Sequence, residues 1–289
     1  MIDRMLASGL AEGRISNMNY ANRLFGLPLS IVLVSVVTVV YPIFSKLAAE
    51  KKQGEISRVL ARAISTSLLA FFPIALICIL FSHDMTQIAF QRGMFTPEDT
   101  AVAALILAIM VPRYLFLCFS DNMNRAFYAM SNTKTPRNIA LAAIGLNIGL
   151  NLLLIRYMEV YGLILAGTLS ALLSGLLSVW YYRRQYGAIG GRRLLLDMTQ
   201  YGVAAACMLP VFWAFSFLWT PTVPFLPRSF FPQSWGITPL WPSAPPLARL
   251  VLPVIFCLGV YVLVLLLLRQ REMLYAVKWV KEKVWKRKK

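Results

Sequence analysis

Residues 24–44 read LFGLPLSIVLVSVVTVVYPIF and contain no charged side chain. An α-helix rises about 1.5 Å per residue, so a stretch of this length crosses the roughly 30 Å hydrocarbon core of a bilayer. Six further apolar stretches follow, at 60–81, 100–119, 138–155, 160–182, 201–219 and 247–268. Their apolar residues run continuously instead of alternating, which predicts helices and not barrel strands. The sequence therefore predicts an all-α, polytopic integral membrane bundle of about seven transmembrane helices.

The composition argues against a water-soluble fold. Hydrophobic residues make up 58% of the chain and charged residues 14%, with a mean hydropathy of +0.65. Soluble domains are about half apolar and a quarter charged, and could not hide this much apolar surface. The chain has one histidine, His83, and its four cysteines fall singly within the apolar stretches. We therefore expect no metal site and no disulfide, and interpret the cysteines as small buried apolar residues.

The formal net charge of +17 would suit a nucleic-acid-binding protein, so the positions of the basic residues decide between the two classes. These residues collect after the first, third, fifth and seventh apolar stretches, within 46–62, 125–137, 183–193 and 269–289. By the positive-inside rule these gaps are cytoplasmic, and no nucleic-acid partner is expected. Residues 1–23 then lie outside. Because they lack a cleavable signal, we expect that a segment of the protein that should precede Met1 is missing.

Three segments outside the apolar stretches have a recognisable character. Residues 90–95 indicate a short amphipathic piece that ends at Gly93, and Thr96-Pro97-Glu98-Asp99 predicts the cap of the next helix. Residues 220–246 hold eight of the sixteen prolines together with several aromatics, which predicts an external loop near the headgroups. The basic tail, 269–289, is either a helix on the anionic inner leaflet or a solvated extension.

Helix breakers within the apolar stretches are informative because a backbone carbonyl freed in lipid must find another partner. Such prolines are either plain kinks or the hinges of a gating transporter. They are Pro28, Pro42, Pro73, Pro112 and Pro210.

Charged side chains in the apolar stretches need a reason, because each costs about 2.5–3.5 kcal/mol at the bilayer centre. Arg113 is the deepest of them. Asp121 and Arg125 are four residues apart, and we interpret them as a structural pair on one helix face. Arg23, just before the first stretch, is either an interfacial anchor or a cavity-facing anion binder.

Polar groups also occur in the fourth and fifth stretches. Asn147 and Asn151 are four apart, so both amides project from one stripe of their helix. Thr168 lies in a run of small residues, 162–170, that permits close helix contact. No paired catalytic carboxylates, activated nucleophile or phosphate-binding glycine loop is found, so we do not expect an enzyme.

Several motifs in order along the chain resemble the MurJ/MviN family of lipid II flippases. The first is LASGLAEGRIS at 6–16, followed by YANRL at 20–24 and LPL at 27–29. Others are Tyr41-Pro42 with Ser45-Lys46, the 90–95 segment that ends in Gly-x-Phe, Phe127-Tyr128-Ala129, and TKTP at 133–136. The last two apolar stretches and the proline-rich loop match least.

The resemblance implies a fold of the multidrug/oligosaccharide-lipid/polysaccharide exporter superfamily, related to the MATE exporters. In that family two six-helix lobes are followed by two extra helices. Aligned so, this chain is the carboxy-terminal half, and an amino-terminal lobe would be a missing partner. We assign 1–19 to the end of a truncated helix and an external loop, and 20–185 to a lobe of five transmembrane helices. Two additional helices, with the external loop 220–246, follow at 186–268, and a basic cytoplasmic tail at 269–289.

The resemblance also implies an activity and candidate sites. Family members move lipid-linked peptidoglycan precursor by alternating access, with cationic side chains that hold its pyrophosphate. Arg23 matches a family cavity arginine, beside Asn22 where the family commonly has Asp, and Arg113 is a second candidate. Some members bind Na⁺, and the corresponding positions here are Asp3, Asn147, Asn151 (in place of an expected Asp) and Thr168.

The expected function is that of a lipid II flippase-like transporter for cell wall biogenesis, in a truncated or split form. Its partners are the lipid-linked precursor and membrane lipids, in the bacterial cytoplasmic (inner) membrane with a cytoplasmic carboxy-terminus. No organic cofactor is expected, and Na⁺ or the membrane potential would drive transport. Two alternatives stay open. One is a flippase for another polyprenyl-linked saccharide, and the other is a non-transporting membrane interaction module.

Overall fold

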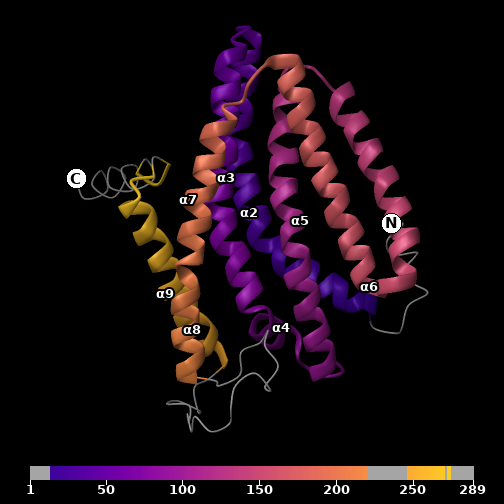
Figure 1. The fold of residues 1–289 in the computed structure, drawn as a ribbon, viewed down its shortest axis with the longest axis vertical. Coiled ribbons are helices and arrows are strands. Elements are labelled where there is room, and N and C mark those ends of the chain that lie inside the picture. Colours follow the sequence, from indigo (N-terminus) through magenta and orange to yellow (C-terminus); the bar gives the residue numbers. More distant parts are fainter. Residues whose placement is uncertain (1–13, 220–245, 271, 275–289) are drawn as a thin grey trace. The chain divides into compact units, whose positions relative to one another are not determined.

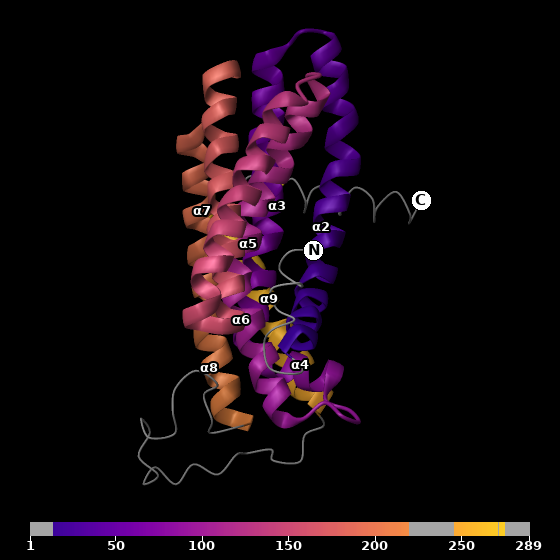
Figure 2. The same cartoon turned by 90° about the vertical axis from the view of Figure 1, so that its right-hand side faces the viewer.

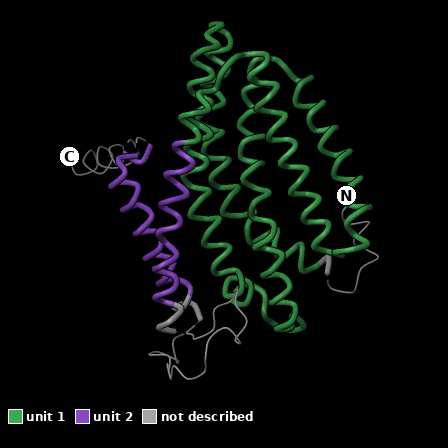
Figure 3. The backbone as a smooth tube through the Cα atoms, in the orientation of Figure 1, with its two compact units in different colours: residues 1–195 green, residues 196–289 purple. Residues whose placement is uncertain are grey.

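The computed structural model describes residues 14–219, 246–270 and 272–274, and in these ranges the regular structure is helical. The chain divides into two compact units, residues 1–195 and 196–289 (Figure 3). The first unit contains α2 (Arg14–Ala49), α3 (Gln53–Leu80), α4 (Ser82–Phe90), α5 (Pro97–Ala129) and α6 (Lys134–Tyr186). Helix α7 (Gly191–Ala206) begins in the first unit and ends in the second, which also contains α8 (Met208–Trp219) and α9 (Pro246–Leu267).

The prediction of a polytopic helical membrane protein is confirmed. In the described ranges, six helices are long and apolar enough to span a bilayer. One of them, α6, has 53 residues and is broken at Glu159, where the backbone φ is 48°. It folds back on itself as a hairpin (Figure 1). The two arms of α6, residues 134–158 and 160–186, are the separate fourth and fifth stretches of the sequence analysis.

Helix α2 is longer than the apolar stretch that predicted it. Its 36 residues correspond to about 54 Å of helix, well beyond the hydrocarbon thickness. The helix begins at Arg14, so residues 14–19 are helical and do not form part of a loop. Figures 1 and 2 show α2, α3, α5 and the arms of α6 running along the long dimension of the first unit.

The connection between α3 and α5 differs in part from the sequence prediction. The short helix α4 ends at Phe90, so residues 91–95 form a turn instead of an amphipathic helical piece. Gly93 lies within that turn at φ 60°, a conformation that favours glycine. The predicted cap of α5 is confirmed, because Thr96 and Asp99 exchange hydrogen bonds in a capping box. The Asp99 carboxylate also accepts a hydrogen bond from Asn17 of α2 at 3.1 Å.

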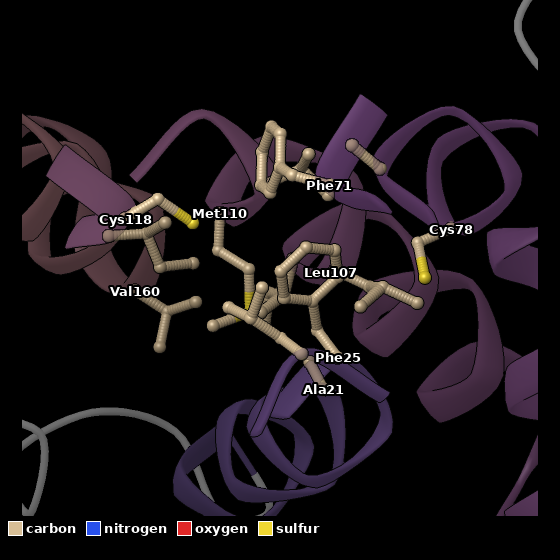
Figure 4. Close-up of a cluster of buried hydrophobic side chains, with 13 residues drawn as sticks. Ala21, Phe25, Phe71, Cys78, Leu107, Met110, Cys118 and Val160 are labelled. Carbon is tan, nitrogen blue, oxygen red and sulfur yellow. The ribbon is translucent and has the colours of Figure 1, made fainter. Parts of the chain in front are cut away.

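The core of the first unit lies where α2, α3, α5 and the second arm of α6 meet. Phe25 of α2 is fully buried, and its ring lies 6.3 Å from that of Phe71 on α3. Leu107 and Met110 of α5 and Val160 of α6 close the cluster (Figure 4). Burial of each such side chain is worth about 1.5–3 kcal/mol against water, but in lipid the close packing itself stabilises the bundle.

The α5–α6 contact depends on small residues. A Cβ at Gly175 would lie 3.4 Å from the carbonyl oxygen of Phe116, and the hydroxyls of Ser120 and Ser174 are 3.1 Å apart. Gly162, near the start of the second arm, lies close against the backbone of Leu154 on the first arm. Close approach at the 162–170 run, expected from its small residues, is therefore confirmed.

A polar and aromatic cluster joins the start of α3, the carboxy-terminal end of α5 and the carboxy-terminal end of α6. Asn132, in the turn after α5, donates hydrogen bonds to Gln185 and to the Tyr186 hydroxyl. Tyr182 stacks edge-on against Phe127 and shares a hydrogen bond with Ser57 of α3. Phe127, and Thr135 of the 133–136 motif, therefore lie at the junction of α3, α5 and α6.

In the second unit, α8 packs against α9. The Phe215 and Phe256 rings are 5.3 Å apart, and the Cys257 thiol lies 3.8 Å from the Met208 carbonyl oxygen. Gln270, after α9, donates hydrogen bonds to Asp197 and Tyr201. The proline-rich segment 220–245 and most of the basic tail lie outside the described residues, so the predictions about them stay predictions.

The α6 hairpin generates the first prediction. A Cβ at position 162 would lie 2.6 Å from the backbone oxygen of Leu154, which cannot move without the first arm. We expect Gly162→Ala to lower the stability of the purified protein by about 1–3 kcal/mol, measured as its thermal melting temperature in detergent. Gly145→Ala is the matched control, since nothing lies within 4 Å of a Cβ there, and it should melt at or above the wild-type temperature. Equal behaviour of the two variants would contradict the hairpin packing.

Candidate functional site

Arg23 lies on the side of α2 that faces away from the core. Residues 21, 25 and 29 of the helix are buried, whereas Arg23 is exposed. The following residues on its stripe are Leu27, Ile31 and Val34, all largely exposed. Arg23 therefore stands at one end of an apolar face that no other described element covers. Among the described residues it has no ion-pair or hydrogen-bond partner.

Arg113 lies near the middle of α5 and is half-buried. Its guanidinium rests against Gly167 on the second arm of α6, where a Cβ would come within 2.7 Å of Nη1. The glycine thus leaves room for the cation between two helices. In the described part of the chain Arg113, like Arg23, has no carboxylate partner.

A hydrogen bond joins the helices that carry the two arginines. The Tyr114 hydroxyl donates to the Asn22 side-chain oxygen at 3.3 Å, and the Asn22 amide donates to the Met18 carbonyl oxygen at 2.9 Å. The Tyr114 and Phe25 rings are also in contact, with centroids 4.5 Å apart. Because Asn22 and Tyr114 are sequence neighbours of Arg23 and Arg113, the two cations lie at the same level of adjacent helices. Asn22 thus connects α2 to α5, and no described hydrogen bond joins it to Arg23.

The structure brings together two of the four residues considered for a cation site. The Asn151 amide, fully buried, donates to the Asn147 side-chain oxygen at 3.0 Å. The Thr168 hydroxyl donates to the Ile164 carbonyl oxygen of its own helix. Asp3 lies outside the described residues. The two amides therefore share one stripe as expected, and a cation site that includes Thr168 and Asp3 stays a prediction.

The expected Asp121–Arg125 ion pair is not formed. An ion pair is formed instead between Lys52 and Glu50, in the turn after α2. The positive charge of Arg125 acts on the Asp121 carboxyl without direct contact, and the Arg125 Nε is buried without an acceptor. The four-residue spacing placed both side chains on one face correctly. It could not determine their rotamers, which depend on neighbouring helices.

Sequence reasoning missed Tyr114 and Gly167 as neighbours of the arginines. The small-residue run signalled that Gly167 allows close helix contact, but not what approaches it. For Tyr114 the sequence carries no signal, because an aromatic residue in an apolar helix is ordinary core composition.

Comparison with known proteins agrees with this architecture. The family profile described as "Lipid II flippase MurJ" matches residues 1–234. A relative named "Probable lipid II flippase MurJ" from Bdellovibrio bacteriovorus is 27% identical over 222 residues, which are 77% of this chain and 42% of the relative. One of the same name from Rickettsia prowazekii is 33% identical over 167 residues, 57% of this chain and 32% of the relative.

The fold also matches a solved structure described as lipid II flippase MurJ in an inward closed conformation. The TM-score is 0.69 at 21% identity, over 91% of this chain and 49% of that one. The chain therefore spans less than half the length of these relatives. Its helices and fold define a multi-pass helical membrane protein. The chain belongs to the lipid II flippase MurJ family.

The second prediction concerns the link between α2 and α5. Tyr114→Phe keeps the ring contact with Phe25 but removes the hydroxyl that binds Asn22. We expect a loss of about 0.5–1.5 kcal/mol, measured as a lower melting temperature in detergent. Tyr128→Phe, on an exposed position of the same helix, is the control and should melt as the wild type does. A Tyr114→Phe protein as stable as this control would show that the bond does not hold the helices together.

Proposed function

We propose that this chain forms the carboxy-terminal lobe of a lipid II flippase in the bacterial cytoplasmic membrane. It would take part in moving the lipid-linked peptidoglycan precursor across that membrane for cell wall synthesis. Family membership and the fold support the class of transporter. The observation that carries the proposal is Arg23, an exposed cation on α2 with no described partner.

The chemistry of the arginine suits the substrate. A guanidinium presents a planar set of donors that forms paired, charge-assisted hydrogen bonds with phosphate oxygens. An arginine in hydrocarbon is costly, so one that lacks a carboxylate partner needs either water or an anionic ligand. The diphosphate of a lipid-linked saccharide supplies such an anion at the membrane surface. Arg23, where the apolar stretch of α2 begins, is placed to receive it.

Arg113 is a second candidate contact for the same substrate. It lies at the same level as Arg23, on the neighbouring helix joined through Asn22 and Tyr114. Two cations at one level would allow both to bind the oxygens of a single diphosphate. Gly167 leaves the guanidinium a place against the second arm of α6 that a Cβ at this position would take.

A complete pathway needs a surface opposite the Arg23 face of α2. We propose that a second helical lobe, corresponding to the additional length of the relatives, provides this surface. Movement of the two lobes would give alternating access, with bends available at Pro28 and Pro42 of α2. The distribution of basic residues supports an orientation with the carboxy-terminus in the cytoplasm.

The third prediction tests Arg23. In cells depleted of their own lipid II flippase, this chain is co-expressed with the amino-terminal half of the Bdellovibrio relative. We expect growth to be rescued by the wild type, lost with Arg23→Ala and partly retained with Arg23→Lys, since lysine keeps the charge but not the paired geometry. Arg58→Ala, an exposed arginine at the start of α3, is the control and should rescue growth. Membrane insertion is checked for each variant by immunoblot of the membrane fraction.

Rescue by Arg23→Ala would remove this residue from the mechanism. The alternatives are separated in vesicles that contain both halves. Translocation of another polyprenyl-linked saccharide but not of lipid II would identify a different flippase. Binding of other membrane proteins without translocation of either substrate would identify an interaction module.

The fourth prediction tests the driving force, which we propose to be Na⁺ or the membrane potential. Asn147 and Asn151 are replaced together by leucine, which removes both amides from the stripe on α6. If they help to hold Na⁺, lipid II translocation in vesicles should lose its dependence on a Na⁺ gradient while its response to membrane potential remains. Asn138→Leu, an exposed amide at the start of the same helix, serves as the control. Unchanged Na⁺ dependence in the double variant would reject this cation site.

A further inference from the structure

One turn of α5 contains the Asp121 carboxyl group and, on the same face, a hydrogen-bond donor and an acceptor that are buried without a partner, here called the orphan donor and the orphan acceptor. The orphan donor is the Nε of Arg125 and the orphan acceptor is the side-chain oxygen of Asn124, both buried without a hydrogen-bond partner. Asp121 precedes them by four and three residues, the spacings that place side chains on one helix face. An unsatisfied buried polar group costs about 1–3 kcal/mol, so two in one turn need an explanation.

Neighbouring polar side chains on α5 do find hydrogen-bond partners. Asn122 is buried, and its amide donates to the Cys118 carbonyl oxygen at 2.8 Å and to the Ser67 hydroxyl of α3 at 3.2 Å. Ser120 is likewise paired with Ser174 of α6. On α5 the buried side-chain atoms without a partner are therefore those of residues 124 and 125, on the face that Asp121 shares.

A carboxyl group can satisfy each orphan, but only in one protonation state. As a carboxylate, Asp121 accepts hydrogen bonds and can take the Arg125 Nε–H. As a neutral acid it carries an O–H donor, and can donate to the Asn124 oxygen. We propose that Asp121, Asn124 and Arg125 form a proton-binding site within the membrane, in which the Asp121 carboxylate accepts from Arg125 and the protonated, neutral acid donates to Asn124.

The surroundings leave Arg125 as the dominant charge on this carboxyl. The thiol of Cys118, one turn earlier, is an ionisable neighbour on the same helix. Helix α2 has no ionisable residue between Arg23 and Tyr41, and the second arm of α6 has none between Tyr161 and Tyr181. On α3 the ionisable residues on either side of Ser67 are Arg62 and Cys78. The first arm of α6 has none between Arg137 and Arg156. Proton transfer at Asp121 would thus change the net charge of a region with few other charges.

Direct detection of the bound proton tests the site without any transport assay. The chain is reconstituted in liposomes, and infrared difference spectra are recorded between high and low pH. We expect the C=O stretch of a buried carboxylic acid in the wild type and its loss in Asp121→Asn. Glu98→Gln, which alters an exposed carboxyl in the first turn of α5, is the control and should keep the band. Persistence of the band in Asp121→Asn would overturn the proposal.

The two neighbours should shift the titration midpoint of the band in opposite directions. Arg125→Gln removes the charge that favours the carboxylate, so the midpoint should rise by about one pH unit, tenfold in proton affinity. Asn124→Leu removes the acceptor for the neutral acid, so the proton affinity should decrease a few-fold and the midpoint should move to lower pH. These two variants decide the matter even if Asp121→Asn does not insert. Shifts in the same direction, or no shift in either, would overturn the site.

Because this readout is proton binding alone, its failure would leave the proposed flippase function untouched. Conversely, a confirmed proton site would stand even if Arg23→Ala transported lipid II normally.

Discussion

The absence of water from the hydrocarbon core is the constraint on which the structure depends. Every backbone donor and acceptor in a span must find a partner within the protein, which is why the described chain is built from helices. Side-chain hydroxyls follow the same rule. Ser67, Thr168 and Ser178 each donate to a carbonyl oxygen one turn earlier, so that none presents a free O–H to lipid. At the exposed start of α5, a capping box serves this purpose for the first helical N–H groups.

Since lipid provides no hydrophobic drive for helix association, close packing must hold the first unit together. Gly175 and Ser174 bring the second arm of α6 against α5, and Gly162 brings it against the first arm. The aromatic rings of Phe25, Phe71 and Tyr114 fill the wider space between α2, α3 and α5. Small residues thus set the distance on one side of α5 and large ones on the other, and both choices keep its polar side chains at defined positions.

The polar side chains that lack a hydrogen-bond or ion-pair partner include those to which we assign functions. Arg23 and Arg113 have no described carboxylate partner, and Asn124 and Arg125 each leave one buried atom unsatisfied. Unpaired polar groups in lipid carry a free-energy cost, and the described part of the chain retains these. An anionic lipid headgroup for the arginines, and a proton for Asp121, would each supply the missing partner.

The sequence by itself determined the class of protein, because bilayer thickness sets the length of an apolar stretch. It also identified the cap at Thr96 and the close contacts of the 162–170 run. Only the tertiary structure decided which side chains meet. Three observations illustrate this: Tyr114 binds Asn22, Gly167 lies against Arg113, and Asp121 does not pair with Arg125. All three depend on how separate helices cross. Helical periodicity determines the face on which a residue lies, whereas the contacts of that face depend on the packing of segments distant in the chain, which local patterns do not encode.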